Sequence, residues 1–369
     1  MILLDFIRDN DNWEELLYDK CIQVKYKGDL AIFNYNLNLC IEQSKEIDFT
    51  DPIVKVCRGI IVDLKNMKVV CFPFNKFGNY TEYYADDIDW QTARVQDKID
   101  GSIVKLYWYN GKWNWATNSM IDASDATTSS VVHKDYLSLI KSASNYNEIP
   151  FSDLNGDFTF IFELVSPENR VVVNYDKTML YHIGTRNNHN GKEYNCNIGI
   201  IKPKEYSLHS LDDCITAVEK LNSGDKCDHE GFVVVDDNYN RVKIKSMQYL
   251  TVHRMLGNGN LTKKRMVELI RANKNLDTLC NDFPNQSAVI YWYKYQMARL
   301  ELDLSEYLIY IANLWEEQEH DRKAVAKLIN KDKLATFGFK WLDDNSQTAK
   351  GMLDDLLPRQ IEKYIEEYK

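Results

Sequence analysis

The sequence lacks several features that would assign it to familiar classes of protein. No stretch of its 369 residues approaches the ~18 consecutive apolar residues of a membrane-spanning helix. The chain begins Met1-Ile-Leu-Leu and meets Asp5 without a preceding basic segment, so we expect no secretory signal peptide. None of the 8 cysteines stands in a Cys-x-x-Cys pair, which disfavours a zinc ribbon. We therefore expect a cytoplasmic protein whose cysteines are reduced and act as buried apolar fillers.

Three common motifs of nucleotide and metal chemistry are also missing. The sequence contains no G-x-x-x-x-G-K-[ST], no strand-linked G-x-G-x-x-G and no H-E-x-x-H. The net charge of −10 argues against a protein that coats nucleic acid non-specifically. Residues 251–369 hold 18 basic and 18 acidic side chains, so the excess acid lies in the first 250 residues. A polyanion site in that part must therefore be a local cluster of Lys and Arg.

The pattern along the chain predicts two domains of different character, in line with its length. Short alternating segments with Asn, Asp and Lys at their turns predict antiparallel strands over most of the first 250 residues. Asn110-Gly111 predicts a two-residue hairpin turn. After Gly257-Asn-Gly259 the periodicity becomes helical. The expected fold class is α+β, with antiparallel sheets and helices in a domain of residues 1–254 and an all-α C-terminal domain of residues 255–369.

Several helices are expected at particular places. The pattern of residues 1–20 predicts one short amphipathic helix, and a second helix is expected over residues 131–142. Thr262 and Asp321 are candidate N-caps, and Pro358 suits the first turn of a last helix. The longest helical pattern covers residues 287–318, and we interpret its aromatic residues as core rather than as a surface for stacking bases.

The segment Lys98-Ile99-Asp100-Gly101-Ser102 is the centre of the functional hypothesis. It precedes strand-like residues, so we predict that it is a turn followed directly by a strand. Gly101 lets the backbone bend and lets a ligand approach. Such a turn can place the amine of Lys98 against an activated phosphate. Because only a neutral amine is a nucleophile, we expect desolvation or a nearby cation to lower the pKa of Lys98. Taken alone, the segment is a weak signal, because such a sequence is more often an ordinary hairpin turn than a catalytic one.

Charged residues at strand ends or inside apolar strands form further candidates. Arg58 opens an apolar strand and either forks onto phosphate oxygens or pairs with Asp63 or another acid. Lys76 lies among Phe72, Phe74, Phe77 and Tyr80, which form either an aromatic-walled pocket around it or a loop that plugs the core. Glu163 lies in a nearly continuous apolar strand and needs a partner, either Arg170 or a bound metal or ligand hydroxyl.

A predicted hairpin supplies the remaining charged candidates. Glu230 starts one strand, and the other strand carries Lys243 and Lys245 two residues apart, hence on one face. His229 is interpreted as a polar turn residue, because no second histidine stands at metal-ligand spacing. One amine, several cations and two or three carboxylates are the inventory for attack on the α-phosphate of a nucleoside triphosphate.

These motifs, in this order, resemble those of covalent nucleotidyltransferases, and within that superfamily the ATP-dependent RNA ligase 1 family typified by T-even bacteriophage RNA ligase. The resemblance covers roughly residues 50–250. Ser102 directly after the motif glycine, and an apolar residue where DNA ligases and capping enzymes usually carry arginine, favour the RNA ligase. The segments that carry the resemblance are Cys57-Arg58-Gly59-Ile60, Phe74-Asn75-Lys76-Phe77, Lys98 to Ser102, Phe162 to Pro167, Asn169 to Val172, Glu230 to Val233 and Val242 to Ser246.

The resemblance implies a nucleotidyltransferase domain of the ATP-grasp-like ligase kind and a three-step reaction. Lys98 would attack ATP to form lysyl-AMP, the AMP would pass to an RNA 5′-phosphate, and a 3′-hydroxyl would displace it. The implied nucleotide contacts are Arg58, Lys76, Lys98, Asp100, Gly101, Glu163, Lys243, Lys245 and Tyr249. Glu163 and Glu230 would serve ribose or a Mg²⁺ or Mn²⁺ ion.

The same resemblance implies a substrate and a setting. The helical domain would select RNA, with nicked tRNA anticodon loops as the typical target of the family. We expect a monomer without membrane contact, in the host cytoplasm if a phage encodes it. Two alternatives are a related enzyme that joins DNA ends or caps RNA, and an RNA-binding protein on an inactive ligase scaffold. The second is disfavoured because Lys98, Glu163, Glu230, Lys243 and Lys245 are all present.

Overall fold

The chain forms two compact units, Met1–His253 and Arg254–Lys369. The computed structural model describes residues 1–128, 130, 132–221, 227–256, 267, 268, 270, 271 and 287–367. In these ranges the first unit combines antiparallel sheets with helices, and the second contains helices only, so the predicted α+β class is confirmed. The candidate cap Thr262 lies outside the described residues. A role of the second unit in selecting RNA stays a prediction.

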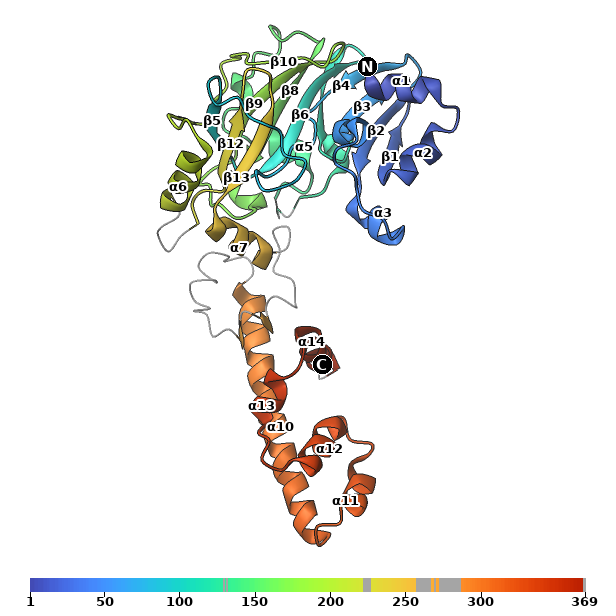
Figure 1. Ribbon diagram of the computed structural model, residues 1–369, viewed down its shortest axis with the longest axis vertical. Coiled ribbons are helices and arrows are strands. Elements are labelled where there is room, and N and C mark those ends of the chain that lie inside the picture. Colours follow the sequence, from blue (N-terminus) through green and yellow to red (C-terminus); the bar gives the residue numbers. More distant parts are fainter. Residues whose placement is uncertain are drawn as a thin grey trace. The chain divides into compact units, whose positions relative to one another are not determined.

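Three sheets build the first unit, as Figure 1 shows. Their strand orders are β1-β2-β3-β4, β10-β9-β8-β6-β7 and β11-β5-β12-β13, and every pairing of neighbouring strands is antiparallel. The strands are β1 (Ile22–Lys27), β2 (Leu30–Tyr35), β3 (Arg58–Asp63), β4 (Lys68–Cys71), β5 (Arg94–Asp97), β6 (Ser102–Tyr109), β7 (Lys112–Thr117), β8 (Phe158–Val165), β9 (Met179–Asn187), β10 (Glu193–Tyr194), β11 (Glu205–Tyr206), β12 (Gly231–Val235) and β13 (Arg241–Lys245).

Helices accompany these sheets and make up the described part of the second unit. In the first unit they are α1 (Ile2–Asp9), α2 (Trp13–Asp19), α3 (Leu37–Glu42), α4 (Pro52–Val56), α5 (Tyr136–Lys141), α6 (Leu211–Leu221) and most of α7 (Met247–Leu256), with short 3-10 turns η1 (Ala123–Asp125), η2 (Tyr146–Glu148) and η3 (Pro167–Asn169). In the second they are α10 (Ser287–Glu317), α11 (Arg322–Ile329), α12 (Ala335–Asp343), α13 (Ala349–Asp354) and α14 (Pro358–Glu367). Each of them is too short or too polar to traverse a bilayer.

The hairpin predicted at Asn110-Gly111 is confirmed. Strands β6 and β7 pair up to Tyr109 and Lys112, which leaves Asn110 and Gly111 as the two loop residues. Their φ angles are 50° and 74°. Positive φ at both central residues is the requirement of the tight turn that matches the twist of paired strands, and asparagine and glycine adopt it most readily.

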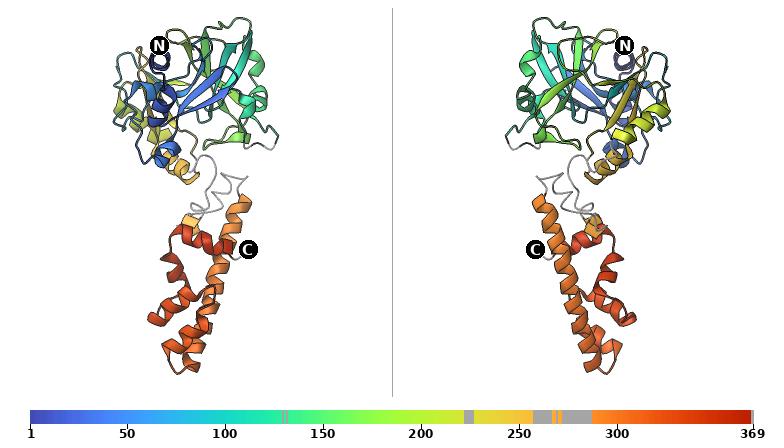
Figure 2. Two further views of the ribbon diagram at one scale, coloured as in Figure 1. Left: turned by 90° about the vertical axis from the view of Figure 1, so that its right-hand side faces the viewer. Right: turned by 90° about the vertical axis from the view of Figure 1, so that its left-hand side faces the viewer.

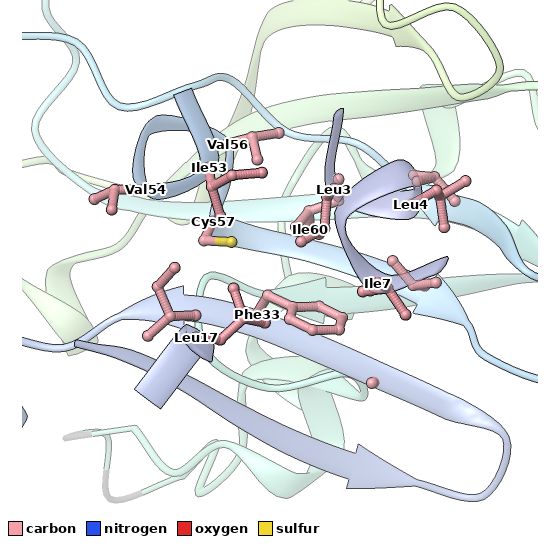
Figure 3. Packing of buried hydrophobic residues seen from close by; sticks show 14 of the residues in the cluster. Leu3, Leu4, Ile7, Leu17, Phe33, Ile53, Val54, Val56, Cys57 and Ile60 are labelled. Carbon is pink, nitrogen blue, oxygen red and sulfur yellow. The ribbon is translucent and has the colours of Figure 1, made fainter. Parts of the chain in front are cut away.

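The core under the first sheet explains an error in the prediction for residues 1–20. Leu3 and Ile7 of α1 pack with Leu17 of α2 and Phe33 of β2 (Figure 3). The two helices are separate because the backbone at Asn10 is extended, with φ −131° and ψ 112°. Two short helices therefore replace the single predicted one.

Strand β6 separates two layers of core. Val104 and Leu106 pack towards Leu139 and Ile140 of α5. Tyr107, on the opposite face of the strand, packs with residues of the first sheet. Helix α5 is shorter than the predicted 131–142, because the Asp135 carboxylate caps it by accepting from the Ser138 N–H at 2.9 Å.

The second unit is organised around α10. Both panels of Figure 2 show later helices running alongside it, and Ile311 of α10 packs with Val325 and Ile329 of α11. Asp321 caps α11 as predicted. The prediction that the aromatic residues of α10 are core is only partly right: Tyr293 is buried, whereas Tyr295 is 62% exposed.

Candidate active site

A cavity of about 340 Å³ lies between the second and third sheets of the first unit. Its walls come from β6, β8 and β9 on one side and from β5, β12 and β13 on the other, with the start of β3 added from the first sheet. Six residues predicted from the sequence line it: Arg58, Lys98, Gly101, Glu163, Lys243 and Lys245. The fold thus gathers side chains from positions 58 to 245 at one place.

The Glu230 carboxylate holds two of these lysines. Lys98 Nζ lies 2.7 Å from Glu230 Oε2, and Lys245 Nζ lies 2.8 Å from Glu230 Oε1. The Glu230 side chain is only 3% exposed. Gly231 follows it with a φ of 144°, and a Cβ there would lie 2.0 Å from the Ile244 carbonyl oxygen, so only glycine allows β12 to pair with β13 at this point.

The ionisation of Lys98 differs from the sequence-based expectation. Burial by itself lowers the pKa of Lys98, but the neighbouring carboxylates, Glu230 foremost, outweigh it and raise that pKa above its ordinary value. Lys98 is therefore an ammonium ion at neutral pH in this arrangement. The expectation of a lowered pKa was wrong because the local motif does not reveal a carboxylate that arrives from residue 230.

Asp100 and Tyr249 are buried beside the cavity and organise the Lys98 turn. Asp100 Oδ2 accepts from the backbone N–H groups of Val172 and Val173 at 2.8 and 2.7 Å. The Tyr249 hydroxyl donates to Asp100 Oδ1 at 2.7 Å. Burial raises the pKa of Asp100, although these donors oppose the shift. The structure therefore gives Asp100 the position of a clamp on the turn.

Glu163 faces the cavity from β8, and its carboxylate forms a hydrogen bond with the backbone of the Lys98 turn. Its Oε1 accepts from the Gly101 N–H at 3.2 Å. Arg170, the alternative partner predicted from the sequence, donates its Nε to the Val172 carbonyl, and no ion pair joins it to Glu163 in the described ranges. Burial raises the pKa of Glu163 to about 7. A Cβ at Gly101 would lie 2.3 Å from the Leu164 carbonyl oxygen, so the close approach of turn and strand requires glycine.

Three cations of the same cavity face the ring of Phe77: Arg58, Lys243 and Arg241. The Arg58 guanidinium lies 5.7 Å from the ring centroid and the Lys243 Nζ lies 5.1 Å from it. Arg58 has no carboxylate partner among the described residues, so its predicted alternative pairing with Asp63 does not occur. Burial, reinforced by neighbouring cations, lowers the pKa of Lys243 to about 7. A cation confined in this way is stabilised by any anion that enters the cavity.

Replacing Lys243 by methionine should stabilise the protein at low pH. The ordinary pKa of Lys243 is 10.5, so between about pH 7 and pH 10.5 the unfolded state binds more protons at this site and stability rises with pH. Below about pH 7 both states are protonated and the folded state bears the full penalty of a buried ammonium. We expect Lys243→Met to melt a few degrees above the parent there, with the gain shrinking as the pH rises.

Thermal unfolding from about pH 6 to about pH 9 measures this effect. The exposed Lys68→Met is the matched control, and its difference from the parent should stay flat with pH. A Lys243→Met protein that is less stable than the parent at the acid end would contradict the buried-ammonium account.

Lys76 lies in an aromatic cage beside the cavity rather than in its wall. Its Nζ lies 5.7 Å, 4.8 Å and 5.4 Å from the ring centroids of Tyr35, Phe49 and Tyr84. Burial lowers the pKa of Lys76. Each of the two interpretations of its loop is right in part. The lysine does enter an aromatic pocket, but residues outside the segment 72–80 supply the rings, while Phe72 and Phe74 are buried.

The sequence interpretation missed two charged residues that line the cavity and one buried lysine outside its lining. Arg241 lines the cavity on the same face of β13 as Lys243 and Lys245, and a bidentate ion pair with Glu193 at 3.2 and 2.9 Å holds it. Continuing the alternation by one more step would have found it. Asp97, next to Lys98 in the chain, also lines the cavity. Lys105 is fully buried and donates to the Gly59 carbonyl at 2.5 Å.

His229 lies near an acid of the cavity wall, and five of the seven described cysteines are buried, as predicted. His229 Nδ1 lies 3.6 Å from Asp97 Oδ1. Among the residues that the structure covers, no group of three or more His, Cys, Asp or Glu side chains is arranged to hold a metal ion without other ligands. Five cysteines are buried and two are partly buried, all as free thiols: Cys21, Cys40, Cys57, Cys71 and Cys214, then Cys196 and Cys227.

The fold and the cavity define a class of protein with a cation-lined site between antiparallel sheets, in which an amine lies among carboxylates. Comparison with protein families identifies the particular family within this class. The family model for RNA ligase matches residues 56–249, and the chain belongs to that family. The resemblance inferred from the motifs is thus confirmed. Lys98, Glu163, Glu230, Lys243 and Lys245 all fall inside the matched segment.

Individual relatives agree with the family. A candidate bifunctional polynucleotide kinase/RNA ligase of Autographa californica nuclear polyhedrosis virus is 31% identical over 297 residues, covering 74% of this chain and 41% of the relative. An RNA ligase of Rhodothermus phage RM378 is 26% identical over 324 residues, covering 70% of this chain and 72% of the relative. The chain thus spans about two fifths of the first relative's length. A solved archaeal ATP-dependent RNA ligase superposes with a TM-score of 0.48 and 9% identity, covering 81% of this chain and 82% of that one.

Proposed function

We propose that this protein joins RNA ends with ATP through a lysyl-adenylate on Lys98. The Lys98 amine loses a proton and attacks the α-phosphorus of ATP. A nitrogen–phosphorus bond forms, the bond from that phosphorus to the β-phosphate oxygen breaks, and pyrophosphate leaves. The RNA 5′-phosphate then takes the AMP from Lys98, and an RNA 3′-hydroxyl displaces AMP from the adenylylated end to form the phosphodiester bond.

The single observation that carries the proposal is the cluster of Lys98, Glu230 and Lys245 at the wall of a cavity lined by Arg58 and Lys243. Converging cations there would neutralise a triphosphate and its leaving pyrophosphate. The ion pair with Glu230 keeps Lys98 protonated until a ligand competes for that carboxylate. Membership in the RNA ligase family supports the same assignment. Lys76, which lines a neighbouring cavity, and the buried Tyr249 remain candidates for contact with the nucleotide.

A divalent ion fits the donors that are present. Mg²⁺ is usually held by one or two carboxylates together with phosphate oxygens of the substrate. Glu163, whose carboxylate lines the cavity, suits that role, and Glu230 is the second candidate. Such an ion would draw charge from the phosphates and thereby assist the departure of pyrophosphate. Mg²⁺ and Mn²⁺ are both compatible with these oxygen ligands.

The substrate and the setting follow from the same proposal. The acceptor is RNA with 5′-phosphate and 3′-hydroxyl ends, with nicked tRNA anticodon loops as the preferred target and the helical second unit as the selector. The protein would act as a monomer in the cytoplasm, that of the host if a phage encodes it. A related activity on DNA ends, or with GTP as in capping, is the alternative.

Mass measurement of the intact protein tests the first step. Incubation with ATP and Mg²⁺ should add one adenylate per chain, and subsequent 5′-phosphorylated RNA should remove it and yield sealed product. Parallel reactions with GTP, and with DNA ends, separate the RNA ligase from the alternatives. A protein that gains no adenylate with either Mg²⁺ or Mn²⁺ would overturn the proposal.

A further inference from the structure

A second cavity, of about 460 Å³, adjoins the candidate active site. Ile103 and Asn118 line both cavities. The second one begins at Ser102, the residue that follows Gly101 of the nucleophile turn, and continues along the segment after β7 to the start of α5. A group bound in it would therefore lie directly beside a phosphate bound near Lys98.

The two cavities differ in charge. No lysine or arginine stands among the described residues that line the second cavity, whereas Arg58, Lys98, Lys243 and Lys245 line the first. The one acid in its lining, Asp125, shares Lys27 with Asp122: the Lys27 Nζ lies 2.7 Å from Asp125 Oδ2 and 2.9 Å from Asp122 Oδ2. The described lining of the second cavity therefore has no excess of positive charge and offers no attraction to a phosphate.

Hydroxyl groups dominate the second cavity. Its lining includes the hydroxyl side chains of Ser102, Thr117, Ser119, Thr127 and Tyr136. A cavity that does not attract phosphate and is rich in groups that both donate and accept is suited to a sugar, because sugar hydroxyls need partners of both kinds.

A small hydrogen-bonded cluster, where the second cavity meets the first, is placed to bind such a hydroxyl. Ser102 Oγ and the Tyr136 hydroxyl lie 3.0 Å apart. Asn169 Nδ2 donates to the Tyr136 hydroxyl at 3.0 Å. The bond between the two hydroxyls uses only one of their two protons, so the pair keeps one proton to donate. Three separate elements, β6, α5 and η3, supply these residues, so their meeting is a property of the tertiary fold.

We propose that the second cavity binds the terminal ribose of the strand that supplies the 3′-hydroxyl, and that Tyr136 and Ser102 recognise its 2′-hydroxyl. The inference rests on the proposed function, because only a strand-joining reaction needs a neutral sugar beside an activated phosphate. A 2′-hydroxyl both donates and accepts, and it is the group that distinguishes RNA from DNA. Tyr136 and Ser102 are thus assigned to the choice of acceptor, and the first cavity to the nucleotide.

Tyr136→Phe tests the assignment, because it removes one hydroxyl and keeps the ring. The full-length protein receives 5′-adenylylated RNA and an acceptor oligonucleotide that ends in either a ribonucleoside or a 2′-deoxyribonucleoside. The parent should prefer the ribo end, and in Tyr136→Phe the ratio of kcat/KM for ribo over deoxy ends should fall about tenfold, chiefly through KM. Lysyl-adenylate formation from ATP, which needs no acceptor, should keep the parent's rate.

Two further variants make the outcome decisive. Ser102→Ala should lower the same ratio, and Tyr83→Phe, at an exposed tyrosine, should leave it unchanged. A parent-like ratio in both Tyr136→Phe and Ser102→Ala would overturn the acceptor site while leaving the ligase intact. Failure of the parent protein to form any adenylate would instead overturn the proposed function on which the site rests.

Discussion

Lys98→Ala should abolish transfer of adenylate from ATP to the protein. Among the described residues that line the cavity, Lys98 stands on the turn before β6, whereas the other two lysines, Lys243 and Lys245, lie on β13 and are assigned to the phosphates. We expect labelling from ATP labelled at its α-phosphate to fall more than about a thousandfold. Denaturing gel electrophoresis of the labelled protein, together with its intact mass, measures the loss.

Lys98→Arg separates chemistry from folding in this experiment. A guanidinium keeps a positive charge beside Glu230 but does not deprotonate, so it preserves the ion pair and removes the nucleophile. Lys98→Arg should therefore be as inactive as Lys98→Ala while unfolding at nearly the parent's temperature. The exposed Lys65→Ala serves as the control that keeps full labelling. Persistent label on Lys98→Arg would show that another residue carries the adenylate.

Glu230→Gln should lower stability and at the same time make the Lys98 amine reactive at lower pH. The change leaves two ammonium groups, each about 20% exposed, without the carboxylate that they share. Breaking a buried ion pair from one side typically costs about 3–5 kcal/mol, and the partial exposure here favours the lower end. Because Glu230 raises the pKa of Lys98, its neutral replacement should lower that pKa.

Two measurements test the predictions for Glu230→Gln, one of stability and one of the reactivity of Lys98. Thermal and denaturant unfolding report the stability loss. Modification of Lys98 by an amine-selective reagent, followed as a function of pH by peptide mass spectrometry, should show its midpoint shifted to lower pH. The exposed Glu46→Gln is the matched control for both. An unchanged midpoint would mean that Glu230 does not govern the ionisation of Lys98, and the proposed role of that ion pair would then be abandoned.

Much of the site could be predicted because its motifs are local. The turn from Lys98 to Ser102, the hairpin at Asn110-Gly111 and the shared face of Lys243 and Lys245 all follow from neighbours in sequence, where backbone preferences and the two-residue period of a strand operate. Arg241 obeyed the same period and was missed only because the alternation was not followed back one step.

Other features could not be predicted from the local sequence, because they depend on contacts between residues that are far apart in the chain. Lys105 stands in an alternating strand like any exposed polar residue, yet it is buried because it meets the Gly59 carbonyl of another sheet. The cage around Lys76 takes its rings from Tyr35, Phe49 and Tyr84, which belong to separate segments. Leu3 of α1 and Leu17 of α2 belong to one core cluster with Phe33 of β2, a contact that the local pattern of residues 1–20 does not reveal.

The sequence by itself determined the α+β class, the RNA ligase family and the chemical inventory of the cavity, because motif spacing and strand periodicity are properties of the chain. Only the tertiary structure decided the ionisation of Lys98 and the difference in charge between the described linings of the two cavities. Those properties depend on which charges stand a few ångströms apart: Glu230 lies 132 residues along the chain from Lys98 and 2.7 Å from it in space. Electrostatic interaction falls with distance through the folded molecule, and sequence separation does not enter it.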